Sequence, residues 1–273
     1  MSGGWKGRLS SRAGRLAAAT LLLMGAVLAV AVAQMDEDYV SLWRDLESKR
    51  RPPADTEFVL ARVRFRDNRG GSGAFGGFGG FGGKPGWAHD YPDAEKHILQ
   101  VASEATGINL RKDSYGIVDL ESDEVFKYPF LYISEVGTMN LTDREIANFR
   151  EHLNRGGFAV VDDFEGARAL QWFEGQMRRI FPDRGFVEMT LEHPVFHGFY
   201  EIPTLDVTPA YGADSPPKFY GYFDEKGRLL MILNHNNDLG DFWEWIDQPR
   251  FPLQPSTEAL RFGINYFLYS LTH

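Results

Sequence analysis

Short apolar segments alternate along this chain with longer segments whose apolar residues recur at helical spacing. The segments 130–134 (FLYIS) and 158–161 (FAVV) are continuous apolar runs, typical of strands that are covered on both faces in a parallel sheet. A further strand is expected at 58–65, where Arg62 and Arg64 interrupt the apolar alternation. The pattern predicts a doubly wound, mostly parallel α/β sheet in which these three strands are neighbours.

The remaining elements complete one α/β domain over residues 57–273. Thr142 and Glu145 have the spacing of a capping box, which predicts a helix from that point. A short strand is expected at 117–120, and an added C-terminal β-hairpin is expected at 219–223 and 229–233. Other helices are predicted at 92–106, at 167–180 and after Ser256.

The N-terminus has the features of an export signal. Basic residues through Arg15 precede the apolar run 16–33, and Ala31-Val32-Ala33 fits a signal peptidase site. The run is about 18 residues long, enough to span a bilayer if it is not cleaved. We therefore expect 1–33 to be a signal peptide or an N-terminal membrane anchor and 34–56 to be a linker with a short helix. The domain is then periplasmic or secreted, or held at the membrane.

The body of the chain is acidic and the whole chain lacks cysteine. The formal net charge is −9, and without residues 1–33 the chain has 25 basic against 38 acidic residues. This balance disfavours nucleic acid and anionic membrane as partners, because both attract clustered Lys and Arg. Membrane contact is expected only through an uncleaved N-terminal segment. The absence of cysteine excludes disulfides, thiolate metal sites and a cysteine nucleophile.

A glycine-rich stretch at 70–86 follows the first predicted strand. It contains nine glycines between Gly70 and Gly83, with phenylalanine at every third position from 75 to 81. So permissive a backbone predicts a loop, which either closes over a site or is a variable surface insertion. It is not a phosphate-binding loop, because no Gly-Lys-Ser/Thr follows.

Polar residues follow the predicted parallel strands at their carboxyl ends, where open α/β sheets bind ligands. Glu135 comes after the strand at 130–134, and Asp162 and Asp163 come after the strand at 158–161. Carboxylates gathered there can bind a hard cation or act as acid and base. The alternative is that Asp162 or Asp163 caps the next helix or orders its loop.

Further candidates lie in other loops. His89 and Asp90 precede the predicted helix at 92–106, so that His89 is a candidate base or metal ligand, unless Asp90 only caps the helix. His193 precedes Pro194 and is expected to lie in a structural turn. The alternative is that His193 is a metal ligand, which the proline makes less favourable. His235 and Asp238 lie in a polar loop that presents either a binding edge or an ordinary tight turn.

An ordered series of short motifs resembles one bacterial family, domain of unknown function 4159, over about residues 57–273. The motifs are Trp87 with Asp90-Tyr91-Pro92, Tyr128-Pro-Phe-Leu-Tyr132, Gly156-Gly-Phe158 with Asp162-Asp163, Phe181-Pro182, His193-Pro-Val-Phe196, Asp238-Leu-Gly240 and Gly263-Ile-Asn265. The resemblance implies a flavodoxin-like fold similar to class I glutamine amidotransferases, and the biochemical activity of the family is not established. The amidotransferase nucleophile is a cysteine at a tight strand–helix turn, and here that turn has Glu135-Val136-Gly137.

Two functional hypotheses follow. The first is a noncatalytic binding or assembly module of the bacterial cell envelope, with an envelope protein as partner. The second is a hydrolase that uses carboxylates and histidine, with or without a divalent metal. No organic cofactor is implied. Convergence of Asp90, Glu135, Asp162 and Asp163 with a histidine in space would favour the enzyme.

Overall fold

The structure is a computed structural model that describes Ser48 and residues 57–66, 85–212 and 215–273. The predicted signal or anchor segment at 1–33, the linker at 34–56 apart from Ser48, and the glycine-rich stretch up to residue 84 lie outside the described residues.

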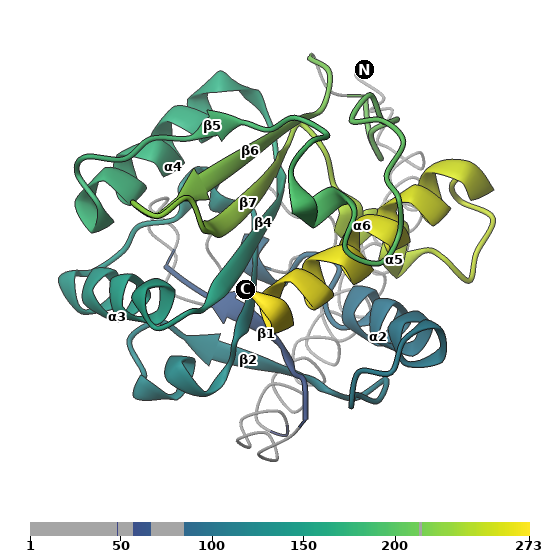
Figure 1. Cartoon of the computed structure of the whole chain (residues 1–273), viewed down its shortest axis with the longest axis horizontal. Coiled ribbons are helices and arrows are strands. Elements are labelled where there is room, and N and C mark those ends of the chain that lie inside the picture. Colours follow the sequence, from purple (N-terminus) through teal and green to yellow (C-terminus); the bar gives the residue numbers. More distant parts are fainter. Residues whose placement is uncertain (1–47, 49–56, 67–84, 213–214) are drawn as a thin grey trace, which may run out of the picture. The chain divides into compact units, whose positions relative to one another are not determined.

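In the part of the chain that the structure describes, seven strands form one mixed sheet in the order β2-β1-β3-β4-β7-β6-β5 (Figure 1). The five strands from β2 to β7 in this order are mutually parallel, and β6 and β5 are antiparallel to their neighbours. The strands are β1 (Leu60–Arg64), β2 (Tyr115–Asp119), β3 (Phe130–Ser134), β4 (Phe158–Phe164), β5 (Val187–Glu188), β6 (Lys218–Phe223) and β7 (Leu229–His235).

The apolar runs become the buried centre of this sheet. Every residue of β3, β4 and β7 is buried, as expected for strands covered on both faces. The prediction that β1, β3 and β4 are parallel neighbours is confirmed by their pairing. Strand β7 is also part of this centre, because it pairs in parallel with β4 on one side and antiparallel with β6 on the other.

Helices cover both faces of the sheet. Figure 1 shows α3 and α4 on one side, whereas α2, α5 and α6 pack together on the other. The α-helices are α2 (Asp93–Ala105), α3 (Asp143–Asn154), α4 (Gly166–Ile180), α5 (Leu239–Glu244) and α6 (Leu253–Thr272), and the 3-10 helices are η1 (Gly86–Ala88), η2 (Asp123–Lys127), η3 (Val136–Thr138) and η4 (Pro194–Phe196). Among the described residues, no helix combines the length and the apolar character needed to cross a membrane.

Two helices differ from the sequence prediction. Helix α6 begins at Leu253, before Ser256, and so includes Pro255. A proline is tolerated in a first turn because the N–H groups there have no intrahelical acceptor. The short helix α5 was not predicted. It begins where the Asp238 side chain accepts a hydrogen bond from the Asp241 N–H, a local cap with little apolar periodicity to signal it.

Candidate metal centre

The parallel strands bring the segments that follow them to one edge of the sheet. Strands β1, β3, β4 and β7 point the same way, so the residues that follow them meet at their carboxyl ends. His89 and Asp90 lie between η1 and α2, Asp163 lies at the end of β4, and Asp238 immediately precedes α5. This edge is where open α/β sheets place their ligands.

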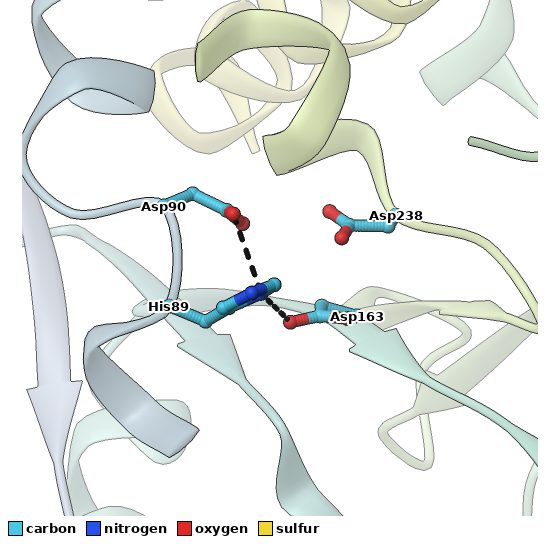
Figure 2. A group of neighbouring side chains, drawn as sticks. All are labelled: His89, Asp90, Asp163 and Asp238. Carbon is cyan, nitrogen blue, oxygen red and sulfur yellow. Dashed lines mark hydrogen bonds and ion pairs between the residues drawn. The ribbon is translucent and has the colours of Figure 1, made fainter. Parts of the chain in front are cut away.

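Four side chains from these segments form a compact group, called here the four-residue cluster: His89, Asp90, Asp163 and Asp238. One ligand atom from each lies within 4.8 Å of all the others. Figure 2 shows the His89 imidazole between the carboxylates of Asp90 and Asp163, with Asp238 facing them. The His89 Nδ1 atom is 2.7 Å from Asp163 Oδ2 and 3.3 Å from Asp90 Oδ1.

Asp163 is aimed at the cluster by an irregularity in β4. The pairing of β4 with β7 shifts register between Val161 and Phe164, as at a β-bulge, and Asp163 has a φ of 52°. A bulge changes the direction in which a strand side chain points. The consequence is that Asp162 and Asp163, adjacent in the sequence, have different surroundings.

The turn that contains His89 and Asp90 is held by a buried arginine from the sheet. Arg62 Nη1 donates to the carbonyl of His89 at 2.6 Å and to that of Trp87 at 3.1 Å. The same guanidinium pairs with Glu95 of α2 and lies 4.7 Å from the centre of the Tyr132 ring. Asp90 itself has a φ of 60°, a left-handed conformation that few non-glycine residues adopt.

Asp238 and Gly240 shape the side of the cluster formed by α5. Asp238 Oδ1 accepts the Asp241 N–H at 2.8 Å, whereas Oδ2 accepts no hydrogen bond from the described residues. A Cβ atom on Gly240 would lie 2.5 Å from Asp90 Oδ2 and 2.9 Å from the Tyr132 hydroxyl. Glycine at position 240 therefore permits Asp90 to approach α5 closely.

Burial and mutual repulsion shift the protonation of the cluster. The hydrogen bond to Asp163 raises the pKa of His89 to about 9, against the opposing effect of burial. Burial raises the pKa of Asp90, and the charge of Asp163 adds to this, whereas His89 and Arg62 lower it. Burial, followed by the charges of Asp163 and Asp90, also raises the pKa of Asp238. Each shift follows from acids being held close together out of water.

Several oxygens of the cluster receive no hydrogen bond from the described part of the chain. Both carboxylate oxygens of Asp90 and Oδ2 of Asp238 are buried and accept no hydrogen bond there, although Asp90 Oδ1 has His89 Nδ1 at 3.3 Å as an ion-pair partner. The side chains of Asp90 and Asp238 are fully or almost fully buried. A buried carboxylate without donors is costly, and a bound cation removes this cost. The cluster thus has the donor set of a cation site, with one imidazole nitrogen and carboxylate oxygens.

Asp162 lies beside the cluster but belongs to a different network. Its carboxylate accepts hydrogen bonds from the Tyr132 hydroxyl at 2.6 Å, from Asn234 Nδ2 at 3.1 Å, and from the backbone N–H groups of Leu239 and Gly240 at 2.9 and 3.0 Å. Burial raises the pKa of Asp162 to about 7, although the Tyr132 hydrogen bond opposes this. This network, called here the Asp162 network, joins β4 to the start of α5 and thereby positions Asp238.

The other predicted candidates lie outside the four-residue cluster. Glu135 follows β3 with a φ of 59°, and its charge helps to raise the pKa of His89. His235 bonds through Nε2 to the Gly166 carbonyl at 3.1 Å. His193 accepts the Val195 N–H at 3.2 Å and begins η4, which agrees with the structural turn expected for it.

Sequence reasoning missed several contributors to this region. Arg62 is visible in the sequence as a charge within an apolar strand, and that interruption is the signal of its buried role. Asp241 and Glu244 were missed because α5 was not predicted. With Asp90 they form a second group whose ligand oxygens lie within 4.8 Å of one another.

The fold and the site define a mixed α/β domain with a buried histidine–aspartate cluster at the carboxyl edge of its sheet. The sequence matches the family described as Domain of unknown function (DUF4159) over residues 77–271, and the chain belongs to this family, as its motifs predicted. No curated protein matches the chain.

Proposed function

We propose that this protein is a hydrolase that depends on a divalent metal bound by the four-residue cluster. The observation that supports this most strongly is the convergence of His89, Asp90, Asp163 and Asp238 with buried oxygens that lack donors among the described residues. Nitrogen and oxygen donors together suit Zn²⁺ or Mn²⁺. In this proposal the metal supplies a water of lowered pKa as the nucleophile.

The chain's own residues have separate parts in this proposal. His89 is the most exposed member of the cluster, with 24% of its side chain accessible, so it marks the side from which a substrate approaches. Arg62 and the Asp162 network position the turns that contain Asp90 and Asp238. Before His89 binds a metal, its imidazole must lose the proton that Asp163 stabilises.

We propose a flavodoxin-like frame, similar to that of class I glutamine amidotransferases, for this domain. The parallel order β2-β1-β3-β4 supports it, because this order reverses direction between β1 and β3, next to the cluster. The turn after β3 is tight, with Glu135 in a left-handed conformation where an amidotransferase has its cysteine. The absence of cysteine excludes cysteine-dependent glutamine hydrolysis.

The decisive experiment is metal analysis of the purified full-length chain, followed by hydrolysis assays on ester, amide and phosphate ester substrates. The wild-type protein is expected to retain a divalent metal and to lose hydrolysis in a chelator. Asp163→Asn is expected to lose both metal and activity. Glu225→Gln is the matched control, because Glu225 lies in the turn before β7, at the opposite end of that strand. A wild-type protein that binds no divalent metal would contradict the proposal.

A second proposal is a noncatalytic binding or assembly module of the cell envelope, with an envelope protein as partner. It is favoured by the export-type N-terminus together with the absence of a nucleophilic cysteine. In this case the protein binds a metal at the cluster and hydrolyses nothing, and a pulldown from envelope extract recovers a partner. Mass spectrometry of the native protein tests the export itself. An N-terminus near Gln34 indicates cleavage, and an intact Met1 in the membrane fraction indicates an anchor.

A further inference from the structure

The second group of carboxylates shares one residue with the four-residue cluster. Asp90, Asp241 and Glu244 each place an oxygen within 4.8 Å of the others. Asp241 and Glu244 lie three residues apart in α5 and therefore on one face of the helix. Asp90 thus belongs to both ligand sets.

The two oxygens of Asp90 face different neighbours. Oδ1 is 3.3 Å from His89 Nδ1, on the side of the four-residue cluster. Oδ2 is directed at α5, since a Cβ on Gly240 would come within 2.5 Å of it. Neither oxygen has a hydrogen-bond donor in the described ranges, and the side chain is completely buried. A cation bound to Oδ1 alone leaves Oδ2 buried without a partner.

The region also holds more carboxylates than one divalent cation neutralises, once His89 has lost its proton to bind a metal. The two sets together contain five carboxylates and one imidazole. One divalent ion neutralises two of these charges, and a second neutralises two more.

We propose that Asp90 bridges two divalent cations, one held with His89, Asp163 and Asp238 and the other held with Asp241 and Glu244. This inference rests on the proposed metal-dependent function and extends it to a two-metal centre. In such centres the ions lie about 3.5–4 Å apart and stabilise both the attacking and the leaving oxygen of a displacement. The bridging role also explains why position 240 is glycine, because any larger residue would separate Asp90 from α5.

The test is titration of the full-length, metal-stripped chain with Mn²⁺, read by calorimetry and by electron paramagnetic resonance. The wild-type chain is expected to bind two ions with an exchange-coupled spectrum. Glu244→Gln is expected to bind one ion with an uncoupled spectrum. Asp241→Asn provides a second variant of the same site, circular dichroism verifies folding, and Glu225→Gln is expected to bind two ions.

The outcomes separate this inference from the proposed function. One ion per wild-type chain, lost in Asp163→Asn and retained in Glu244→Gln, overturns the bridge and leaves the single-metal site. Two ions that are unaffected by Glu244→Gln and by Asp241→Asn overturn the assignment of the second ligand set. A folded wild-type chain that binds no Mn²⁺ overturns the inference, and if it binds no other divalent metal it also overturns the proposed function.

Discussion

Asp162 and Asp163 are adjacent in the sequence, yet they belong to regions with opposite properties. Asp162 is surrounded by donors, and its carboxylate accepts four hydrogen bonds from two side chains and two backbone groups. Asp163 lies 2.7 Å from His89 Nδ1 and accepts the Ser134 hydroxyl at 3.2 Å. It lies beside Asp90 and Asp238, and three of the four carboxylate oxygens of these two residues lack donors in the described residues. The comparison shows that burial alone does not mark a ligand site. A buried carboxylate that already has its hydrogen-bond donors is an anchor, and a group of buried carboxylates short of donors is a candidate cation site.

The largest effect is expected from removing the anchor. Asp162→Ala leaves the Tyr132 hydroxyl and two backbone N–H groups buried without an acceptor, and should lower the free energy of unfolding by about 3–5 kcal/mol. Urea denaturation of the metal-free protein measures this. Asp163→Asn is the matched comparison and should cost less, because the hydrogen bonds that it weakens to His89 and Ser134 are offset by the loss of a like charge from the cluster. An equal loss of unfolding free energy in the two variants would contradict the assignment of different roles to Asp162 and Asp163.

A divalent metal bound at the four-residue cluster should stabilise the folded protein. At a free Mn²⁺ or Zn²⁺ concentration a hundred times the dissociation constant, the gain in unfolding free energy is about 2.7 kcal/mol. Differential scanning calorimetry with and without metal checks this as a rise in Tm. Asp163→Asn should lose the rise and Glu225→Gln should keep it. A rise that persists in Asp163→Asn would place the metal elsewhere.

Glycine 240 lies between the two regions, and filling its space should disturb both. Gly240→Ala brings a methyl group against Asp90 Oδ2 and the Tyr132 hydroxyl, and is expected to cost about 1–2 kcal/mol of stability and to weaken metal binding. Gly175→Ala in α4 is the control, since a Cβ there has nothing within 4 Å and a helical alanine is stabilising by up to about 1 kcal/mol. Unchanged metal affinity in Gly240→Ala would argue against the close approach of Asp90 to α5.

The smallest expected difference between the two regions is in how the free energy of unfolding depends on pH. The folded-state pKa of His89 is raised to about 9, so the stability it contributes is complete below its unfolded pKa and is lost as pH rises towards 9. The folded-state pKa of Asp162 is raised to about 7, so the stability that it contributes is lost as pH rises from its unfolded pKa towards 7. Urea unfolding in chelator at about pH 5, 7 and 9 should therefore show falling stability. His89→Gln should flatten the upper part of the curve alone, and a wild-type curve that rises above neutrality would contradict these shifts.

The sequence by itself determined the class of the sheet and named candidate residues at the carboxyl ends of its strands. Continuous apolar runs at β3 and β4 predicted parallel, doubly covered strands, since a segment without polar residues must be buried on both faces. Topology then required the residues after these strands to lie at one edge, which is why Glu135, Asp162 and Asp163 were named together. His89 and Asp90 were named because they precede a predicted helix, and Asp238 because it lies in a polar loop. Membership of the family also followed from the order of short motifs.

Only the tertiary structure decided which of these candidates lie together. The bulge in β4 separates Asp163 from Asp162, and the sequence Asp-Asp has no feature that predicts a bulge. The donors that satisfy Asp162 come from residues 30 to 78 positions away along the chain, so its role depends on contacts that no local pattern encodes. Helix α5, which adds Asp241 and Glu244, is too short to leave a periodic signal and is stabilised by its packing against α2 and α6. Local sequence propensity determines where helices and strands form, whereas the partners of a buried charge are determined only when segments distant in the sequence come into contact.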